Sequence, residues 1–97
     1  MRMLALEKDR PDASPWDFEP HLQEEARAVW HLQQAGTIRD IYFRDDRQEA
    51  VIVLEVHDVA EAERVLGQLP LVKAGLAEFE LIGLRPYSGF SRLFKKE

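Results

Sequence analysis

Cysteine is absent from this chain of 97 residues. Its absence excludes disulfide bonds, a thiolate nucleophile and cysteine-based zinc or iron–sulfur sites. Long hydrophobic runs are also absent: no segment approaches the roughly 20 apolar residues that a membrane-spanning helix needs. The N-terminus becomes charged too early for a secretory signal. We therefore expect a cytoplasmic protein.

Positive charge is scarce, since 13 Lys and Arg residues stand against 18 Asp and Glu, for a net charge of -5. Nucleic-acid surfaces depend on clustered basic residues. The only such cluster here is Arg92, Lys95 and Lys96, which we interpret as a solvated chain end. The three histidines show no spacing typical of a metal site. We expect no nucleic-acid or membrane partner, no metal and no cofactor.

The hydrophobic pattern predicts one domain over residues 1–97, with its core in about 3–87 and a C-terminal tail at 88–97. Strands are predicted at residues 3–7, 37–44, 50–56 and 78–85. One helix should run from about Pro20 to a left-handed cap at Gly36, and another from the N-cap Asp58 to Pro70. The order is β-α-β-β-α-β, the ferredoxin-like α+β plan: an antiparallel four-stranded sheet with two helices on one face.

The strand at residues 50–56 is apolar on both faces, which indicates a sheet that is covered on both sides. Two helices can cover only one of them. We expect the other face to meet a second copy of the chain, as in a dimeric α+β barrel, with the C-terminal tail contributing to a homodimer or higher homo-oligomer.

The segment at residues 8–19 contains Pro11 and Pro15, so we expect an irregular loop. Its two aromatic residues, Trp16 and Phe18, should fold over the first helix or across the mouth of a pocket. They could equally attach the loop to the core.

Glu25 falls on the apolar arc of the first helix, together with Leu22, Val29, Trp30 and Leu32. A carboxyl group in such surroundings must be paired, protonated or chemically active. Burial raises the pKa of a carboxyl group toward the range that suits a general acid or base. The alternative interpretation is a structural ion pair with Arg39 or Arg44.

Two segments, WHLQQAGTIR at 30–39 and LGQLPL at 66–71, make residues 20–87 resemble the muconolactone isomerase family. The resemblance implies a ferredoxin-like domain that associates through its sheet. It also implies a cofactor-independent proton shift on a small unsaturated lactone or carboxylic acid during aromatic degradation. Glu25 matches an acidic position of the family, and Arg39 matches an Arg that could hold a substrate carboxylate. Arg44 is offset by one residue from a further family Arg.

Further candidate site residues lie on the strands and near the chain's C-terminal end. Glu55 and His57 alternate with Val53 and therefore share one face of a strand. If that face lines a cavity between subunits, His57 could be a second proton carrier and Glu55 a substrate contact. Tyr42, Trp30, Lys73 and Tyr87 complete the set of predicted substrate-binding residues, although Tyr87 could instead pack the tail on a neighbouring subunit together with Phe90.

Two other functions fit the same sequence. One is a non-catalytic dimeric module that binds a small ligand or serves a scaffold, with Glu25 as an internal salt-bridge partner. The other is an oxygen-using or haem-binding enzyme on the same architecture, because a fold does not determine a function.

Overall fold

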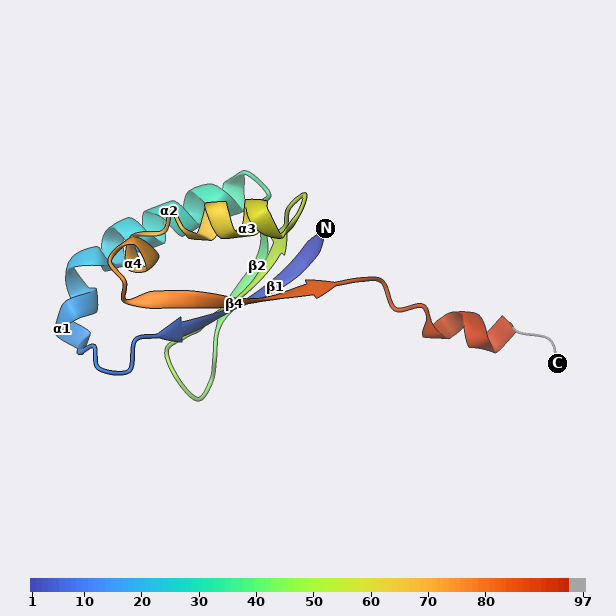
Figure 1. Ribbon diagram of the computed structural model, residues 1–97, viewed down its shortest axis with the longest axis horizontal. Coiled ribbons are helices and arrows are strands. Elements are labelled where there is room, and N and C mark those ends of the chain that lie inside the picture. Colours follow the sequence, from blue (N-terminus) through green and yellow to red (C-terminus); the bar gives the residue numbers. More distant parts are fainter. Residues whose placement is uncertain (95–97) are drawn as a thin grey trace.

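The computed structural model describes residues 1–94, and it confirms the predicted α+β plan. Lys95 and Lys96 of the predicted solvated end lie outside this range. The sheet is antiparallel, with the strand order β2-β3-β1-β4. Its strands are β1 (Arg2–Asp9), β2 (Ile38–Phe43), β3 (Ala50–Glu55) and β4 (Ala77–Leu84). All the helices of the domain lie over the same face of the sheet (Figure 1).

The two predicted helices are present as α2 (Leu22–Gln34) and α3 (Val59–Leu66). Gly36 has a φ of 83°, the left-handed conformation that we expected after α2. The carboxylate of Asp58 accepts a hydrogen bond from the Glu61 N–H at 2.8 Å and so caps α3. Both helix ends thus follow local sequence signals.

The prediction of an irregular segment at residues 8–19 is wrong at both of its ends. Strand β1 continues to Asp9, and a short helix, α1 (Pro15–Phe18), leads through the 3-10 turn η1 (Glu19–His21) into α2. Pro15 occupies the first turn of α1, where proline is tolerated because that N–H has no partner within the helix.

Pro70 likewise begins a helix instead of ending one. Helix α3 ends at Leu66, and Pro70 is the first residue of α4 (Pro70–Lys73). Residues 1–94 therefore contain four α-helices, two more than the sequence predicts.

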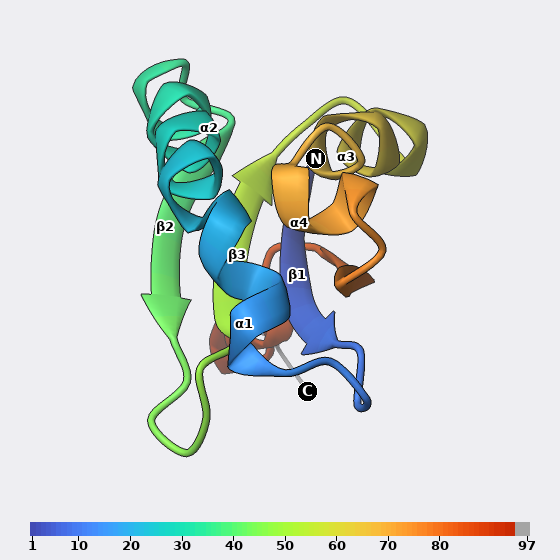
Figure 2. The same ribbon diagram turned by 90° about the vertical axis from the view of Figure 1, so that its left-hand side faces the viewer.

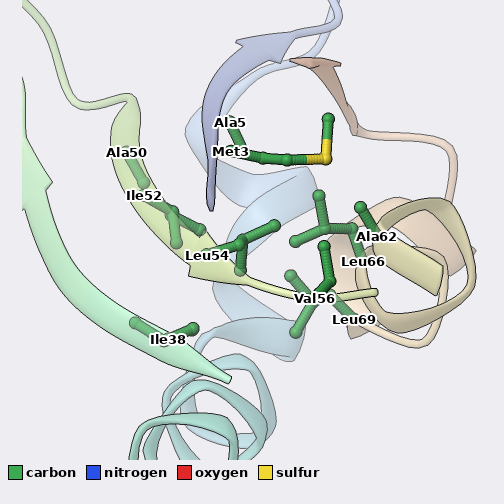
Figure 3. Close-up of a cluster of buried hydrophobic side chains, with 10 residues drawn as sticks. All are labelled: Met3, Ala5, Ile38, Ala50, Ile52, Leu54, Val56, Ala62, Leu66 and Leu69. Carbon is green, nitrogen blue, oxygen red and sulfur yellow. The ribbon is translucent and has the colours of Figure 1, made fainter. Parts of the chain in front are cut away.

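The core lies between the sheet and the helices (Figure 3). Ten buried side chains form it: Met3, Ala5, Ile38, Ala50, Ile52, Leu54, Val56, Ala62, Leu66 and Leu69. Helix α3 contributes two of them, whereas α2 contributes none and reaches the core only through partly buried residues. Figure 2 shows α2 on the side of β2 and α3 on the opposite side of the helical layer. The looser packing of α2 leaves room for a cavity.

The other face of the sheet carries a second set of apolar side chains. Leu4 and Leu6 of β1 pair with Val53 and Val51 of β3, and Ile82 of β4 lies beside Leu4. The first four are partly exposed and Ile82 is exposed, and no element of residues 1–94 lies over them. We call these five residues the outer apolar face.

The C-terminal tail extends away from the domain after β4 (Figure 1). It contains the 3-10 segment η2 (Gly89–Phe94), and the rings of Tyr87 and Phe90 pack edge to face with 4.9 Å between their centres. Tyr87, Phe90, Leu93 and Phe94 are all exposed. Among the described residues, no helix is long and apolar enough to cross a membrane.

Replacing Leu54 by alanine should test the core. Leu54 is fully buried, and removing its side-chain carbons leaves a cavity, so we expect the free energy of unfolding to fall by about 2–5 kcal/mol. Urea denaturation would measure the change. The exposed Val59 is a control, because Val59→Ala should change stability by no more than about 0.5 kcal/mol. Equal effects of the two changes would contradict this core.

Replacing Asp58 by alanine should test the cap of α3. The Glu61 N–H loses its acceptor, and a lost N-cap costs about 1 kcal/mol of unfolding free energy. Asp58→Asn keeps a side-chain oxygen at the same place and should retain most of the stability. Thermal unfolding of the two variants would separate the hydrogen bond from other effects of the substitution.

Candidate functional site

A cavity of about 850 Å³ lies between the sheet and the segment from α1 to α2. Its volume falls within the range of small-molecule sites. The wall is mostly apolar, and its large side chains are Phe18, Leu22, Val29, Trp30, Ile41, Phe43, Ile52, Leu71 and Phe79. Glu7, Asp9, Arg10, Glu19 and Glu25 supply the charged groups. Acidic groups in an apolar cavity make this the candidate functional site.

Helix α2 forms one wall of the cavity, and the side of the helix that faces the cavity is the one that the sequence predicts to be apolar. Leu22 and Trp30 on this arc are 44% and 58% exposed, although an apolar arc usually packs into a core. They line the cavity instead. Of the two aromatic residues before α2, Phe18 lines the cavity and also packs on a second buried cluster, whereas Trp16 is exposed.

Glu25 lies on this wall, in the first turn of α2, with its side chain half-buried. Its Oε1 accepts a hydrogen bond from the Leu71 N–H at 3.0 Å, in the first turn of α4. Burial raises the pKa of Glu25, while the Leu71 N–H and the nearby His21 oppose the shift. The alternative of an ion pair with Arg39 or Arg44 is wrong, since neither residue is within salt-bridge distance of Glu25 in residues 1–94.

Glu7 is a site residue that the sequence analysis missed. Its side chain is buried on the helix-facing side of β1, and its Oε1 accepts a hydrogen bond from the Ala50 N–H at 2.9 Å. The alternation of Met3, Ala5 and Glu7 on one face of the strand was the signal that could have revealed it. Asp9 follows on the same face and also lines the cavity.

Burial raises the pKa of Glu7 to about 8. A hydrogen bond with the Asp9 carboxyl and the negative charges of Asp9 and Glu25 act in the same direction, and the Ala50 N–H opposes them. Neutral Glu7 can donate a hydrogen bond, and ionised Glu25 can accept a proton. The cavity therefore holds carboxyl groups suited to acid and base roles.

Trp30 and Tyr42 line the cavity as part of the predicted site. Arg39 does not: it lies at the β-bulge between Ile38 and Asp40, and its guanidinium is beside Gly36. Arg44 is held by Asp46 at 2.7 Å and reaches Glu49 at 4.0 Å. The cavity thus gathers three of the nine predicted residues, Glu25 among them.

The remaining predicted residues lie outside this cavity. Glu55 binds the N-terminal amino group at 2.9 Å and Arg2 at 3.2 Å, which together lower its pKa. His57 is exposed, and its backbone N–H donates to Glu61. Lys73 is exposed at the end of α4, and Tyr87 is in the tail. Any role for these four residues depends on a second subunit that places them near a ligand.

No metal-binding group of three or more His, Cys, Asp or Glu side chains occurs in residues 1–94. The chemistry that the cavity itself offers is proton transfer and hydrogen bonding by carboxyl groups, in apolar surroundings that strengthen both.

Comparison with known proteins supports the architecture. No protein-family model and no curated protein sequence matches the chain. Among solved structures, muconolactone isomerase is similar with a TM-score of 0.75 and 23% identity, over 91% of this chain and 92% of that one. The 5-chloro-2-hydroxyhydroquinone dehydrochlorinase of Burkholderia phenoliruptrix, in complex with 2,5-dihydroxybenzoquinone, has a TM-score of 0.64 and 18% identity, over 92% and 98% of the two chains. These similarities confirm the muconolactone isomerase-like α+β fold that the sequence motifs predict.

Proposed function

We propose that this protein catalyses a cofactor-independent proton shift on a small unsaturated lactone or related carboxylic acid, in the cytoplasm. The observation that carries the proposal is Glu25, a carboxyl group with a raised pKa on the apolar wall of a cavity of about 850 Å³. The names of the two structural neighbours point to small oxygenated, unsaturated ring compounds as ligands of this fold.

The proposed reaction moves one proton between two carbons of a conjugated substrate. The Glu25 carboxylate removes a proton from the γ carbon, at the far end of the C=C–C=O system, and the electron pair of that C–H bond moves through the double bond onto the carbonyl oxygen as a dienolate. Glu25 then returns the proton to the α carbon next to the carbonyl group, so that the double bond moves out of conjugation. A raised pKa makes Glu25 a stronger base than an ordinary glutamate, and no redox partner is required.

The aromatic side chains and Arg39 have proposed supporting roles. Trp30 and Tyr42 provide flat apolar surfaces in the cavity wall for an unsaturated ring. Arg39 forms no ion pair within residues 1–94, so its guanidinium is available for a substrate carboxylate that extends past the cavity.

Replacing Glu25 by glutamine should abolish the base without changing the shape of the side chain. With muconolactone as substrate, we expect kcat to fall by at least about 100-fold, the usual contribution of a general base. The loss of the ultraviolet absorbance of the conjugated lactone would follow turnover. Glu24→Gln is a matched control, because Glu24 is exposed on the same turn and pairs with Arg27 at 2.8 Å. Full activity of Glu25→Gln would contradict the proposed role.

A non-catalytic binding module is a second candidate, favoured by the hydrogen bond from the Leu71 N–H to Glu25. In that case Glu25 serves to join α2 to α4. Glu25→Ala would then lower the free energy of unfolding by about 1–3 kcal/mol, because a partly buried N–H loses its acceptor. A cavity that binds unsaturated acids without turnover in the wild-type protein would favour this candidate.

We further propose that the outer apolar face and the exposed tail join copies of the chain into a homodimer or a higher homo-oligomer. Leu4, Leu6, Val51 and Val53 form a continuous apolar patch across two adjacent strands. Apolar patches of this kind commonly mark association surfaces. Association over this face would bring a second copy close to Glu55, whose predicted role requires such a neighbour.

Placing a charge on this face should separate the subunits. Val53→Lys puts an ammonium group in the middle of the patch, where burial in an interface is costly. We expect the molar mass from light scattering to fall to 11.3 kDa, the mass of one chain. Gln34→Lys, on the exposed surface of α2, is the control and should keep the wild-type mass. A wild-type protein that is monomeric at high concentration would contradict the proposal.

A further inference from the structure

Glu7 and Asp9 place two carboxyl groups side by side on the cavity face of β1. They are separated by one residue along the strand, so their side chains point to the same side of the sheet. Glu7 is only 9% exposed, Asp9 is half-buried, and both line the cavity. Neither residue takes part in the proton shift proposed for Glu25.

The hydrogen-bond partners of these two carboxyl groups indicate that one of the groups carries a proton. Glu7 accepts one hydrogen bond, from the Ala50 N–H, and the buried Oδ1 of Asp9 accepts none from any described residue. The neighbouring Asp9 carboxyl group helps to raise the pKa of Glu7, through a side-chain hydrogen bond and through its negative charge. Two ionised carboxylates cannot satisfy each other, because both only accept. A proton on Glu7 removes this conflict, because its single O–H group can donate to Asp9 while the cavity is empty and can turn to a ligand oxygen when one is bound.

The charged groups around the pair favour protonation. Glu25 faces Glu7 from α2 and adds a negative charge. The Glu49 carboxylate approaches from the loop before β3, where its Oε2 accepts a hydrogen bond from the Asp9 N–H at 2.8 Å, and its charge is offset by Arg44 at 4.0 Å and Arg47 at 3.7 Å. Glu19 adds a further negative charge to the cavity wall. The cation of this wall is Arg10, and its guanidinium is bound by Asp12 at 2.9 Å. Negative charge therefore dominates around Glu7.

We propose that Glu7, whose proton is directed to Asp9 while the cavity is empty, turns its O–H group to donate a hydrogen bond to the negatively charged oxygen that forms on a ligand in this cavity. The ligand class is an enolate or phenolate. The inference rests on the proposed function and deepens it: while Glu25 carries the proton between two carbons, Glu7 stabilises the dienolate oxygen and keeps its own proton. Glu7 is then a catalytic residue, and Asp9 is a positioning residue.

This role matches the surroundings of Glu7. A neutral acid in an apolar cavity is a strong donor toward an oxyanion, because no water competes for the hydrogen bond. An ionised Glu7 would instead repel the same oxygen. The ligand's negative charge is thus accepted only while Glu7 carries its proton.

The protonation of Glu7 can be measured without any ligand. Side-chain carbon-13 NMR of glutamate-labelled protein, with the Glu7 signal assigned by its loss in Glu7→Gln, should show a titration midpoint near pH 8. Asp9→Asn removes the neighbouring charge and supplies an N–H donor to the carboxylate, so the midpoint should move down. Glu80→Gln, on the exposed face of β4 and paired with Lys8, should leave it unchanged. A midpoint near 4.5, the ordinary value, would overturn the inference.

Stability should depend on pH with a sign set by the same proton. The folded state holds this proton more tightly than the unfolded state, so the stability that Glu7 contributes is fully present below about pH 4.5 and is lost as the pH rises through about 8. Urea denaturation should show this fall in the wild type, and Glu7→Gln should flatten it. An equal slope in both proteins would count against a shared proton.

Binding of 2,4-dinitrophenol, a phenolate that is fully ionised above neutral pH, tests the donor role. Its affinity for the wild type should fall by about tenfold per pH unit above about pH 8, as Glu7 loses its proton. Glu7→Met, which has similar length and no donor, should bind at least about tenfold more weakly at neutral pH and lose this pH dependence. Equal binding by Glu7→Met would overturn the role, and if that variant does not fold, a flat wild-type profile would do the same.

These measurements separate the inference from the proposed function. A wild-type protein that titrates and binds the phenolate as described, yet leaves muconolactone unchanged, would contradict the proton shift and support the donor role of Glu7. Conversely, a protein that turns over muconolactone although Glu7 is ionised at neutral pH would support the proton shift and contradict the donor role of Glu7.

Discussion

The structure depends on β1, whose helix-facing side chains are apolar at the start of the strand and acidic at its end. Met3 and Ala5 at its start are buried in the core, while Glu7 and Asp9 further along line the cavity. The strand lies in the interior of the sheet between β3 and β4, so every residue on this face must be covered by helices or face an enclosed space. The apolar half of this face packs against the helices, whereas the acidic half lines the cavity beneath α1 and α2.

The cavity follows from the difference between the two long helices. Helix α3 fixes its position with the buried residues Ala62 and Leu66, whereas α2 buries none of its side chains completely. Helix α2 packs on the core only through the partly buried Ala28, Val29 and Leu32, and its ends are held by the Gly36 turn into β2 and by the Leu71 N–H that donates to Glu25. A helix held in this way can leave an apolar surface open to a ligand without loss of the core.

Sequence patterns were sufficient for the sheet and the long helices, because alternation and capping are local signals. Gly36 and Asp58 bounded their helices as expected. The proline rule failed at Pro15 and Pro70, since a proline that can end one helix can also begin the next, and only the surrounding packing decides between them. Glu25 was found because it interrupts an apolar arc. The position of Arg44 depends on its ion pairs with neighbours in the loop, which the spacing of the strand did not reveal.

Glu7 could not be identified as a site residue from the alternation of the strand alone. Its alternation with Met3 and Ala5 already placed it on the buried face, but the same pattern fits a strand end that emerges into solvent. The Ala50 N–H distinguishes these cases, because a carboxyl group that binds the backbone of the adjacent strand beneath the helical layer is inside the fold. Burying a carboxyl group beside another one costs free energy unless they share a proton. In the proposed reaction, Glu7 is the neutral acid and Glu25 the base, and the two groups divide these roles between β1 and α2 on two walls of one cavity.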